Sequence, residues 1–211
     1  SAIEVDLRLR SPHWSRVTAS ADTVNDGNGL WVRADHDCSD PTDPEVLASH
    51  PGRLTAIQID GDEVVLAQDR LRSWPLFWSL EDGMSDAQRL VISDDATLMR
   101  EAVSTPRLDA RARREFLDAG FVTGSDTLLA GIHQTEQGTV VRIDRATGRV
   151  RTINHSLGRF SEETDTVVDP EDFSDLLTEA LDAVLGRLLV DLDRRPGTPR
   201  LVVPLSGGLD S

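Results

Sequence analysis

The amino-acid sequence predicts an α+β protein, with a largely β domain over residues 1–160 and the start of an α/β domain over residues 161–211. Three observations predict this division. Short apolar runs separated by turn residues recur through the first part. A polar stretch over residues 161–169 is typical of a linker. After it come a long run with helical periodicity, a short apolar strand and a glycine-rich loop.

The first part is predicted to consist mainly of strands. Ile3, Val5, Leu7 and Leu9 alternate with charged residues, which indicates a half-buried strand. Further strands are expected at residues 30–32, 54–59, 64–67, 76–78, 90–92, 138–143 and 148–153. Because the turns at 60–62 and 81–83 are short, the stretch from 54 to 92 is predicted to be a β-meander. Residues 35–51 are polar and contain three prolines, so most of them are expected to form a loop.

Two helices are predicted. The first begins after Asp109, covers residues 111–119 with Phe116 and Leu117 facing inward, and ends at Gly120. The second begins at Asp169 and Pro170. Its apolar side chains follow at helical spacing: Phe173, Leu176, Leu177, Ala180, Leu181, Val184, Leu185 and Leu188. It is expected to end near residues 194–197, before a buried strand at 201–205.

Composition and charge exclude several classes of function. The net charge of −15 disfavours nucleic acid and anionic membranes as partners. No run approaches the roughly 20 apolar residues that cross a bilayer, and the first residues do not resemble a secretory signal. Cys38 is the single cysteine, so a cytoplasmic location is expected. All 22 basic residues are arginine, so any lysine needed for phosphate chemistry must lie outside this chain.

The last six residues, Ser206-Gly207-Gly208-Leu209-Asp210-Ser211, form a pattern suited to binding pyrophosphate. Glycines allow several backbone N–H groups to approach one phosphate, and serine hydroxyls add donors. Asp210 could hold the geometry of the loop or approach a phosphate-bound Mg²⁺. The pattern is neither a Walker A loop nor a dinucleotide fingerprint.

These six residues match the PP-loop signature of ATP pyrophosphatases, and segments upstream resemble the asparagine synthetase-like family. The upstream resemblance rests on residues 69–78 (Asp-Arg-Leu-Arg-Ser-Trp-Pro-Leu-Phe-Trp), on Val91-Ile92-Ser93-Asp94, and on the order of short motifs between 108 and 138. It implies an Ntn-type (αββα-like) glutaminase domain of two packed antiparallel sheets over residues 1–160. A PP-loop synthetase domain would begin in residues 161–211. It also implies ATP and Mg²⁺ as cofactors, and a carboxylate activated as an acyl-adenylate for attack by ammonia or an amine.

The sequence departs from that family at the expected glutaminase site. Family glutaminases use an N-terminal cysteine, whose own α-amino group serves as the base. Residue 1 here is Ser1, which is either an alternative nucleophile or a tag remnant, and the Arg-Gly-Pro-Asp and Asn-Gly-Glu-Ile segments are missing. Cys38 with His36 permits a nucleophile or a metal interpretation, both disfavoured for neighbours in a polar loop. An inactive glutaminase-like domain is therefore expected, as in lasso-peptide macrolactam synthetases and β-lactam synthetases.

Three functions follow from these observations. The first is an AMP-forming amide ligase acting on a small-molecule or peptide carboxylate, with macrolactam closure included. The second is a non-catalytic scaffold or peptide-binding domain of such an enzyme, and the third is a glutamine amidotransferase that uses Ser1. Enzymes of this family extend well beyond the PP-loop, so the expected partners include the remainder of a synthetase domain, and a homodimer is also considered.

Other side chains are expected to be structural. Packing is favoured over ligand stacking for the four tryptophans, Trp14, Trp31, Trp74 and Trp78. Four histidines, His13, His50, His133 and His155, show no metal-ligand spacing. Arg70 and Arg72 could pair with nearby carboxylates, and no catalytic role is expected for them.

Overall fold

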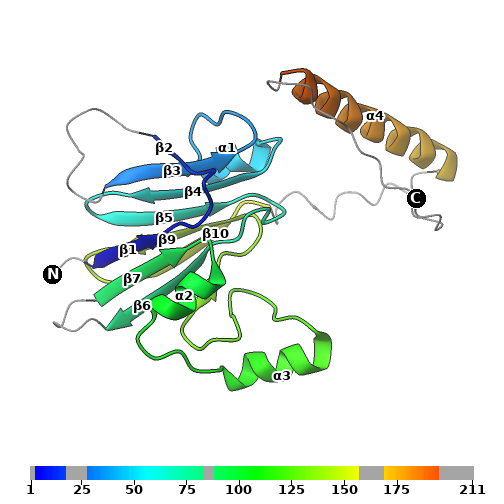
Figure 1. The fold of residues 1–211 in the computed structure, drawn as a ribbon. Helices are drawn as coiled ribbons and strands as arrows, with labels where there is room; N and C mark the ends of the chain where they lie inside the picture. Colours follow the sequence, from blue (N-terminus) through cyan, green and yellow to red (C-terminus); the bar gives the residue numbers. More distant parts are fainter. Residues whose placement is uncertain (1–2, 18–27, 83–87, 157–168, 195–211) are drawn as a thin grey trace. The chain divides into compact units, whose positions relative to one another are not determined.

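The structure is a computed structural model that describes residues 3–17, 28–82, 88–156 and 169–194. The chain divides into two units, residues 1–160 and residues 161–211. In the first unit the described residues have a mixed α+β architecture built on two sheets (Figure 1). The coarse α+β prediction is therefore confirmed.

The larger sheet has six strands, all antiparallel to their neighbours. In spatial order they are β10 (Val150–Asn154), β9 (Thr139–Asp144), β5 (Glu63–Gln68), β4 (Leu54–Ile59), β3 (Gly29–Ala34) and β2 (Ser15–Val17). The central strands β4 and β5 are buried along nearly their whole length, because hydrophobic clusters cover both faces of this part of the sheet.

The smaller sheet has four strands in the order β1 (Glu4–Arg8), β7 (Gln88–Ser93), β6 (Phe77–Asp82) and β8 (His133–Gln134). Its pairs are antiparallel except for β1 with β7, which are parallel. The expected antiparallel sheets are therefore present, with one parallel pair at the edge of the smaller sheet. The predicted meander over 54–92 is wrong, because β4 and β5 belong to the larger sheet and β6 and β7 to the smaller one.

The main hydrophobic core joins the two sheets. Side chains at every second position meet there, including Ile57 and Ile59 of β4, Val64 and Leu66 of β5, Leu90 and Ile92 of β7, and Val141 and Ile143 of β9. Ile3, Leu76 and Trp78 also belong to this core. Because each sheet contributes alternate residues to one face, the period of two in the sequence is explained by this shared layer.

Short helices cover the outer faces of the sheets. Helix α1 (Pro44–Ser49) places Leu47 against Leu54, Val65 and Val140 on the larger sheet. Helix α2 (Ala96–Ala102) places Met99 against Val91 on the smaller sheet (Figure 1). The order helix, sheet, sheet, helix is compatible with the expected αββα arrangement. Helix α1 lies within the stretch that was predicted to be mostly loop.

Helix α3 (Ala110–Ala119) begins and ends as predicted. Asp109 caps it by accepting from the backbone N–H of Ala112 at 2.8 Å, and Gly120 ends it in a left-handed conformation with φ 83°. The expected inward orientation of two side chains is wrong, because Phe116 is 44 % and Leu117 68 % exposed. Ala112 is the buried residue of this helix.

The second unit contains helix α4 (Pro170–Arg194), which agrees with the predicted long helix. At its start, the backbone N–H of Phe173 donates to the carbonyl of Asp169 at 2.9 Å. The apolar side chains along it, from Phe173 to Val190, are exposed. Among the described residues, no helix is both long enough and apolar enough to cross a membrane.

Candidate functional site

The residues with the sharpest sequence-based assignments are not among those that the structure describes. Ser1 lies outside the described residues, as do Ser206, Gly207, Gly208, Leu209, Asp210 and Ser211. Their proposed roles in nucleophilic catalysis and pyrophosphate binding therefore stay sequence-based predictions. The first unit is where side-chain geometry defines a candidate site.

The environment of Cys38 disfavours the nucleophile interpretation. Cys38 packs at the edge of the cluster formed by Leu47 and its neighbours, and burial raises the pKa of its thiol. A raised pKa lowers the thiolate population, and thiolate is the reactive form. The ring of His36 lies 6.3 Å from that of His50, centroid to centroid. Across the described part of the chain, no group of three His, Cys, Asp or Glu side chains is placed to hold a metal ion.

Three of the four tryptophans pack as expected, and one of these, Trp31, also has the guanidinium carbon of Arg16 at 5.2 Å from its ring centroid. Trp78 is buried in the core, while Trp14 and Trp31 are half-buried against it. Trp74 instead stacks with two arginines, with the guanidinium carbons of Arg33 and Arg53 at 4.3 and 4.8 Å from its ring centroid.

Asp69 organises the loop that follows β5. Its buried carboxylate accepts from the backbone N–H groups of Leu54 at 3.0 Å, Leu71 at 2.7 Å and Ser73 at 3.3 Å. Its own carbonyl accepts from the N–H of Arg72 at 3.2 Å. These bonds hold Arg72 at φ 52°, a left-handed conformation that non-glycine residues adopt at a cost. The loop is therefore held in one conformation, with Leu71 at its exposed tip.

Behind this loop, a buried polar network connects the two sheets. The Gln68 side chain donates to the Thr55 hydroxyl at 2.9 Å and accepts from the Thr135 hydroxyl at 3.0 Å. The backbone N–H of Thr135 donates to the carbonyl of Leu76 at 2.9 Å. Because a buried amide without partners is costly, this satisfied network fixes the position of the 69–76 segment.

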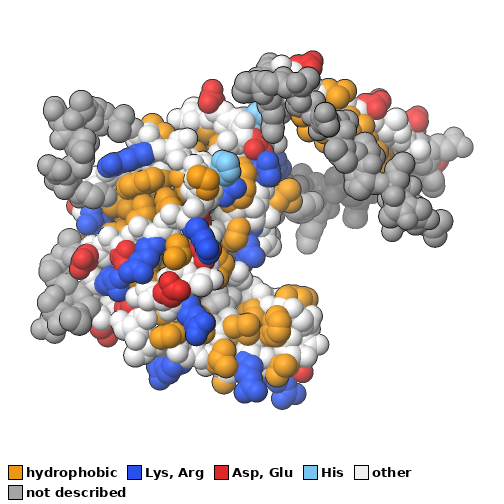
Figure 2. Space-filling model, in the orientation of Figure 1, with side chains coloured by type: hydrophobic (Ala, Val, Ile, Leu, Met, Phe, Trp, Pro, Cys, Tyr) orange, Lys and Arg blue, Asp and Glu red, His pale blue; other side chains and the backbone are white. Residues whose placement is uncertain are grey.

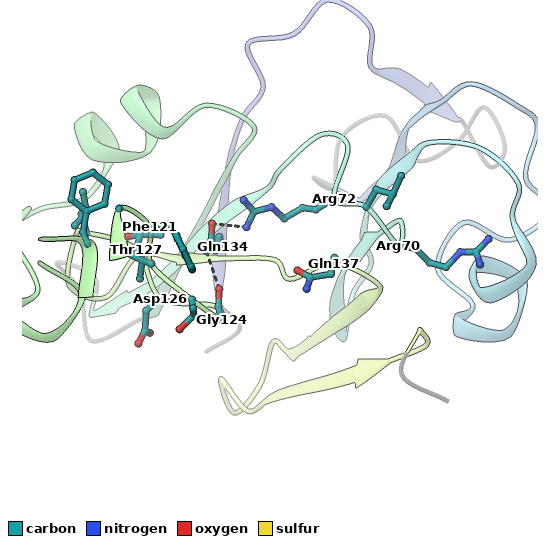
Figure 3. Close-up of a pocket in the computed structure, with 14 residues that line it drawn as sticks. Arg70, Arg72, Phe121, Gly124, Asp126, Thr127, Gln134 and Gln137 are labelled. Carbon is teal, nitrogen blue, oxygen red and sulfur yellow. Dashed lines mark hydrogen bonds between the residues drawn. The ribbon is translucent and has the colours of Figure 1, made fainter. Parts of the chain in front are cut away.

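An open groove lies beside the Asp69 loop and has a volume of about 840 Å³ (Figure 3). One wall is the tip of that loop, residues 70–72, and the other is the segment from Gly120 to Leu128 that follows α3. Gln134 and Gln137 also line it. We call this cavity the loop groove.

Hydrogen bonds tie the two walls of the loop groove together. The Arg72 guanidinium donates to the Gln134 side chain at 2.6 Å, and the amide of Gln134 donates to the carbonyl of Gly124 at 2.8 Å. Figure 3 shows Arg72 extending toward Gln134, whereas Arg70 extends away from it. Asp126 lines the same wall as Gly124, with a carboxylate oxygen 3.8 Å from Nδ1 of His133.

The chemical character of the loop groove is that of a binding surface. Leu71, Phe116 and Phe121 supply exposed apolar area, and Arg70 and Arg72 supply positive charge. Within the described residues, neither arginine forms an ion pair, so the expected pairing with carboxylates is not found there. A cavity that combines apolar area with a few polar groups is the usual form of a ligand site.

Sequence reasoning missed the loop groove, although one local signal was present. The stretch Gly120-Phe121-Val122-Thr123-Gly124 places bulky apolar residues between two glycines, where a loop exposes them. The contact between this stretch and the opposite wall could not be predicted. It runs through Gln134, which is 62 positions from Arg72 in the sequence.

No protein-family model matches the chain, and no curated protein matches its sequence.

Proposed function

We propose that the chain is part of an ATP-dependent, AMP-forming amide ligase of the asparagine synthetase-like kind. The observation that carries the proposal is the motif Ser206-Gly207-Gly208-Leu209-Asp210-Ser211, placed after a helix and after an apolar segment that the sequence predicts to be a strand. Helix α4 supports this order of elements. The two sheets with outer helices in the first unit are compatible with an Ntn-type domain.

In the proposed reaction, a carboxylate oxygen of the substrate attacks the α-phosphorus of ATP and the α–β bond breaks. Pyrophosphate leaves, and an acyl-adenylate remains. The backbone N–H groups around Gly207 and Gly208, with the hydroxyls of Ser206 and Ser211, would bind the pyrophosphate as its charge develops. Mg²⁺ would neutralise the phosphates, with Asp210 either near it or holding the loop. An amine or ammonia then attacks the acyl carbon, AMP leaves, and the nitrogen loses a proton.

The proposed substrates are a small-molecule or peptide carboxylate and an amine donor. An amine within the same peptide would close a macrolactam, as in the synthetases that make lasso peptides. Ammonia or a separate amine would give an open amide.

The proposal is tested by following nucleotide products in the full-length protein that carries this chain. With a panel of carboxylates and amines, it predicts equal amounts of AMP and pyrophosphate. Gly207→Val, which adds a side chain where the loop must approach phosphate, is expected to abolish pyrophosphate release. Gly186→Ala is the matched control, because nothing lies within 4 Å of the added Cβ. Formation of ADP and phosphate instead would reject an AMP-forming mechanism.

A second candidate is that the first unit is a non-catalytic scaffold. The observation that favours it is that, among the described residues, the hydrophobic core clusters are formed entirely by residues between Ile3 and Ile143. A segment of residues 1–160 is then expected to unfold cooperatively by itself. Release of glutamate from glutamine that is lost in Ser1→Ala would instead support the amidotransferase alternative.

A further inference from the structure

Large apolar side chains that line the loop groove are exposed to solvent. Leu71 is 84 % and Phe121 59 % exposed, and both line the cavity together with Phe116. Figure 2 shows apolar side chains gathered over the region of α3. Removing such surface from water is favourable by about 25 cal/mol per Å². A cluster of this kind at a cavity is typical of a surface that another molecule covers.

The charges of the loop groove are also unbalanced. Six of the described arginines pair with carboxylates, and the others do not: the pairs are Arg8 and Arg89 with Asp6, Arg10 with Asp95, Arg53 with Asp35, Arg114 with Asp118, and Arg142 with Glu63. Arg70 and Arg72 form no such pair among the described residues, although the chain has a net charge of −15. Asp126, which lies 3.8 Å from His133, is the carboxylate among the lining residues. Counted over the lining residues alone, two arginines against one aspartate give a net positive charge.

The walls of the loop groove are fixed before any ligand arrives. Asp69 holds the backbone at Leu71 and Ser73, and Gln134 joins Arg72 to Gly124. Little of the binding free energy is therefore needed to order the protein when a ligand binds. Gly120 and Gly124 have positive φ and open space where a Cβ would stand, so a chain can approach the backbone closely.

We propose that the loop groove binds an extended peptide segment that carries an acidic side chain next to a bulky apolar one. The acidic group pairs with Arg70 or Arg72, and the apolar group covers Leu71 and Phe121. Nucleic acid does not fit, because it carries a charge at every phosphate along its length, whereas the lining residues offer two arginines beside three exposed apolar side chains. A small inorganic anion would leave the three apolar side chains exposed. This inference goes beyond the ligase reaction, because every residue in it belongs to the first unit.

The test measures peptide binding to the full 211-residue chain by fluorescence anisotropy. The probe is a fluorescein-labelled hexapeptide, Leu-Glu-Phe-Asp-Leu-Glu. Two comparison peptides replace its acidic residues by lysine or its apolar residues by serine. The acidic apolar peptide is expected to bind with a dissociation constant on the order of micromolar, and both comparison peptides at least about tenfold more weakly. Raising NaCl from about 0.05 M to about 0.5 M is expected to weaken binding, since Arg70 is exposed to solvent and Arg72 is only half-buried.

Variants then locate the binding surface. Leu71→Ser and the double variant Arg70→Glu, Arg72→Glu are each expected to raise the dissociation constant at least about tenfold. Leu117→Ser is the matched control, because Leu117 is 68 % exposed on α3 and does not line the groove. It is expected to change binding less than about twofold. No binding by the acidic apolar peptide, equal binding by the lysine peptide, or an equal loss in Leu117→Ser would each overturn the proposal. Because no nucleotide is present, the result is independent of the ligase assay.

Discussion

Replacing Asp69 by alanine tests how the Asp69 loop is held. The carboxylate of Asp69 accepts from the N–H groups of Leu54, Leu71 and Ser73 and from the hydroxyl of Ser73. In Asp69→Ala the N–H of Leu54, a fully buried residue, loses its acceptor. An unsatisfied buried donor costs about 1–3 kcal/mol, and each bond nearer the surface contributes about 0.5–1.5 kcal/mol. The free energy of unfolding is therefore expected to fall by about 3 kcal/mol.

The assay is urea unfolding of the full chain, followed by tryptophan fluorescence. The matched control is Asp60→Ala, because Asp60 accepts two backbone N–H bonds, from Asp62 at 3.0 Å and Glu63 at 2.8 Å, in an exposed turn. Its cost is expected to be about 1 kcal/mol. Asp69→Asn keeps one acceptor oxygen and should fall between the two. If Asp69→Ala lowers the free energy of unfolding no more than Asp60→Ala does, the assigned role of Asp69 is wrong.

Three further predictions concern stability. Burial, with His36 nearby, lowers the pKa of His50, so folding favours the neutral form of this side chain. The free energy of unfolding is therefore expected to fall as the pH drops below about 6.5. Urea unfolding at several pH values should show a smaller decrease of this free energy at low pH in His50→Gln. Gly138 has φ 62°, and a Cβ there would lie 2.3 Å from the Ser156 hydroxyl. Gly138→Ala should therefore cost about 2 kcal/mol in the same assay, and Gly61→Ala, which has open space, much less. Leu66→Ala should cost about 2–5 kcal/mol by opening a core cavity; a loss as small as that of Leu71→Ala would contradict the core assignment.

Local signals in the sequence were sufficient to predict several elements. Asp109 and Gly120 mark the ends of α3 because a cap and a left-handed residue act within a few positions. The same kind of signal was present for α1, where Asp43 precedes Pro44 and Glu45, and for α2, where Asp95 accepts from two backbone N–H groups. Both helices are only six and seven residues long, so their apolar periodicity is too short to recognise.

Long-range arrangement was not predictable in the same way. The apolar runs over 54–92 show that strands exist, but they do not show that the chain changes sheets between β5 and β6. That crossing depends on the pairing of β5 with β9 and on the buried Gln68 network, which join residues far apart in sequence. The sequence also did not show which face of α3 is buried. The bulky side chains of Phe116 and Leu117 are exposed, and the small residue Ala112 is buried instead. The loop groove depends on the same kind of long-range contact.

The central proposal is that this chain belongs to an AMP-forming ligase, and isotope exchange tests it most directly. Radiolabelled pyrophosphate is incubated with ATP, Mg²⁺, the full-length protein and each carboxylate of a panel. The account predicts carboxylate-dependent appearance of label in ATP, because acyl-adenylate formation is reversible. It further predicts loss of this exchange in Gly207→Val and its retention in Gly186→Ala. Turnover of ATP to ADP and phosphate, with no exchange for any carboxylate, would contradict the account.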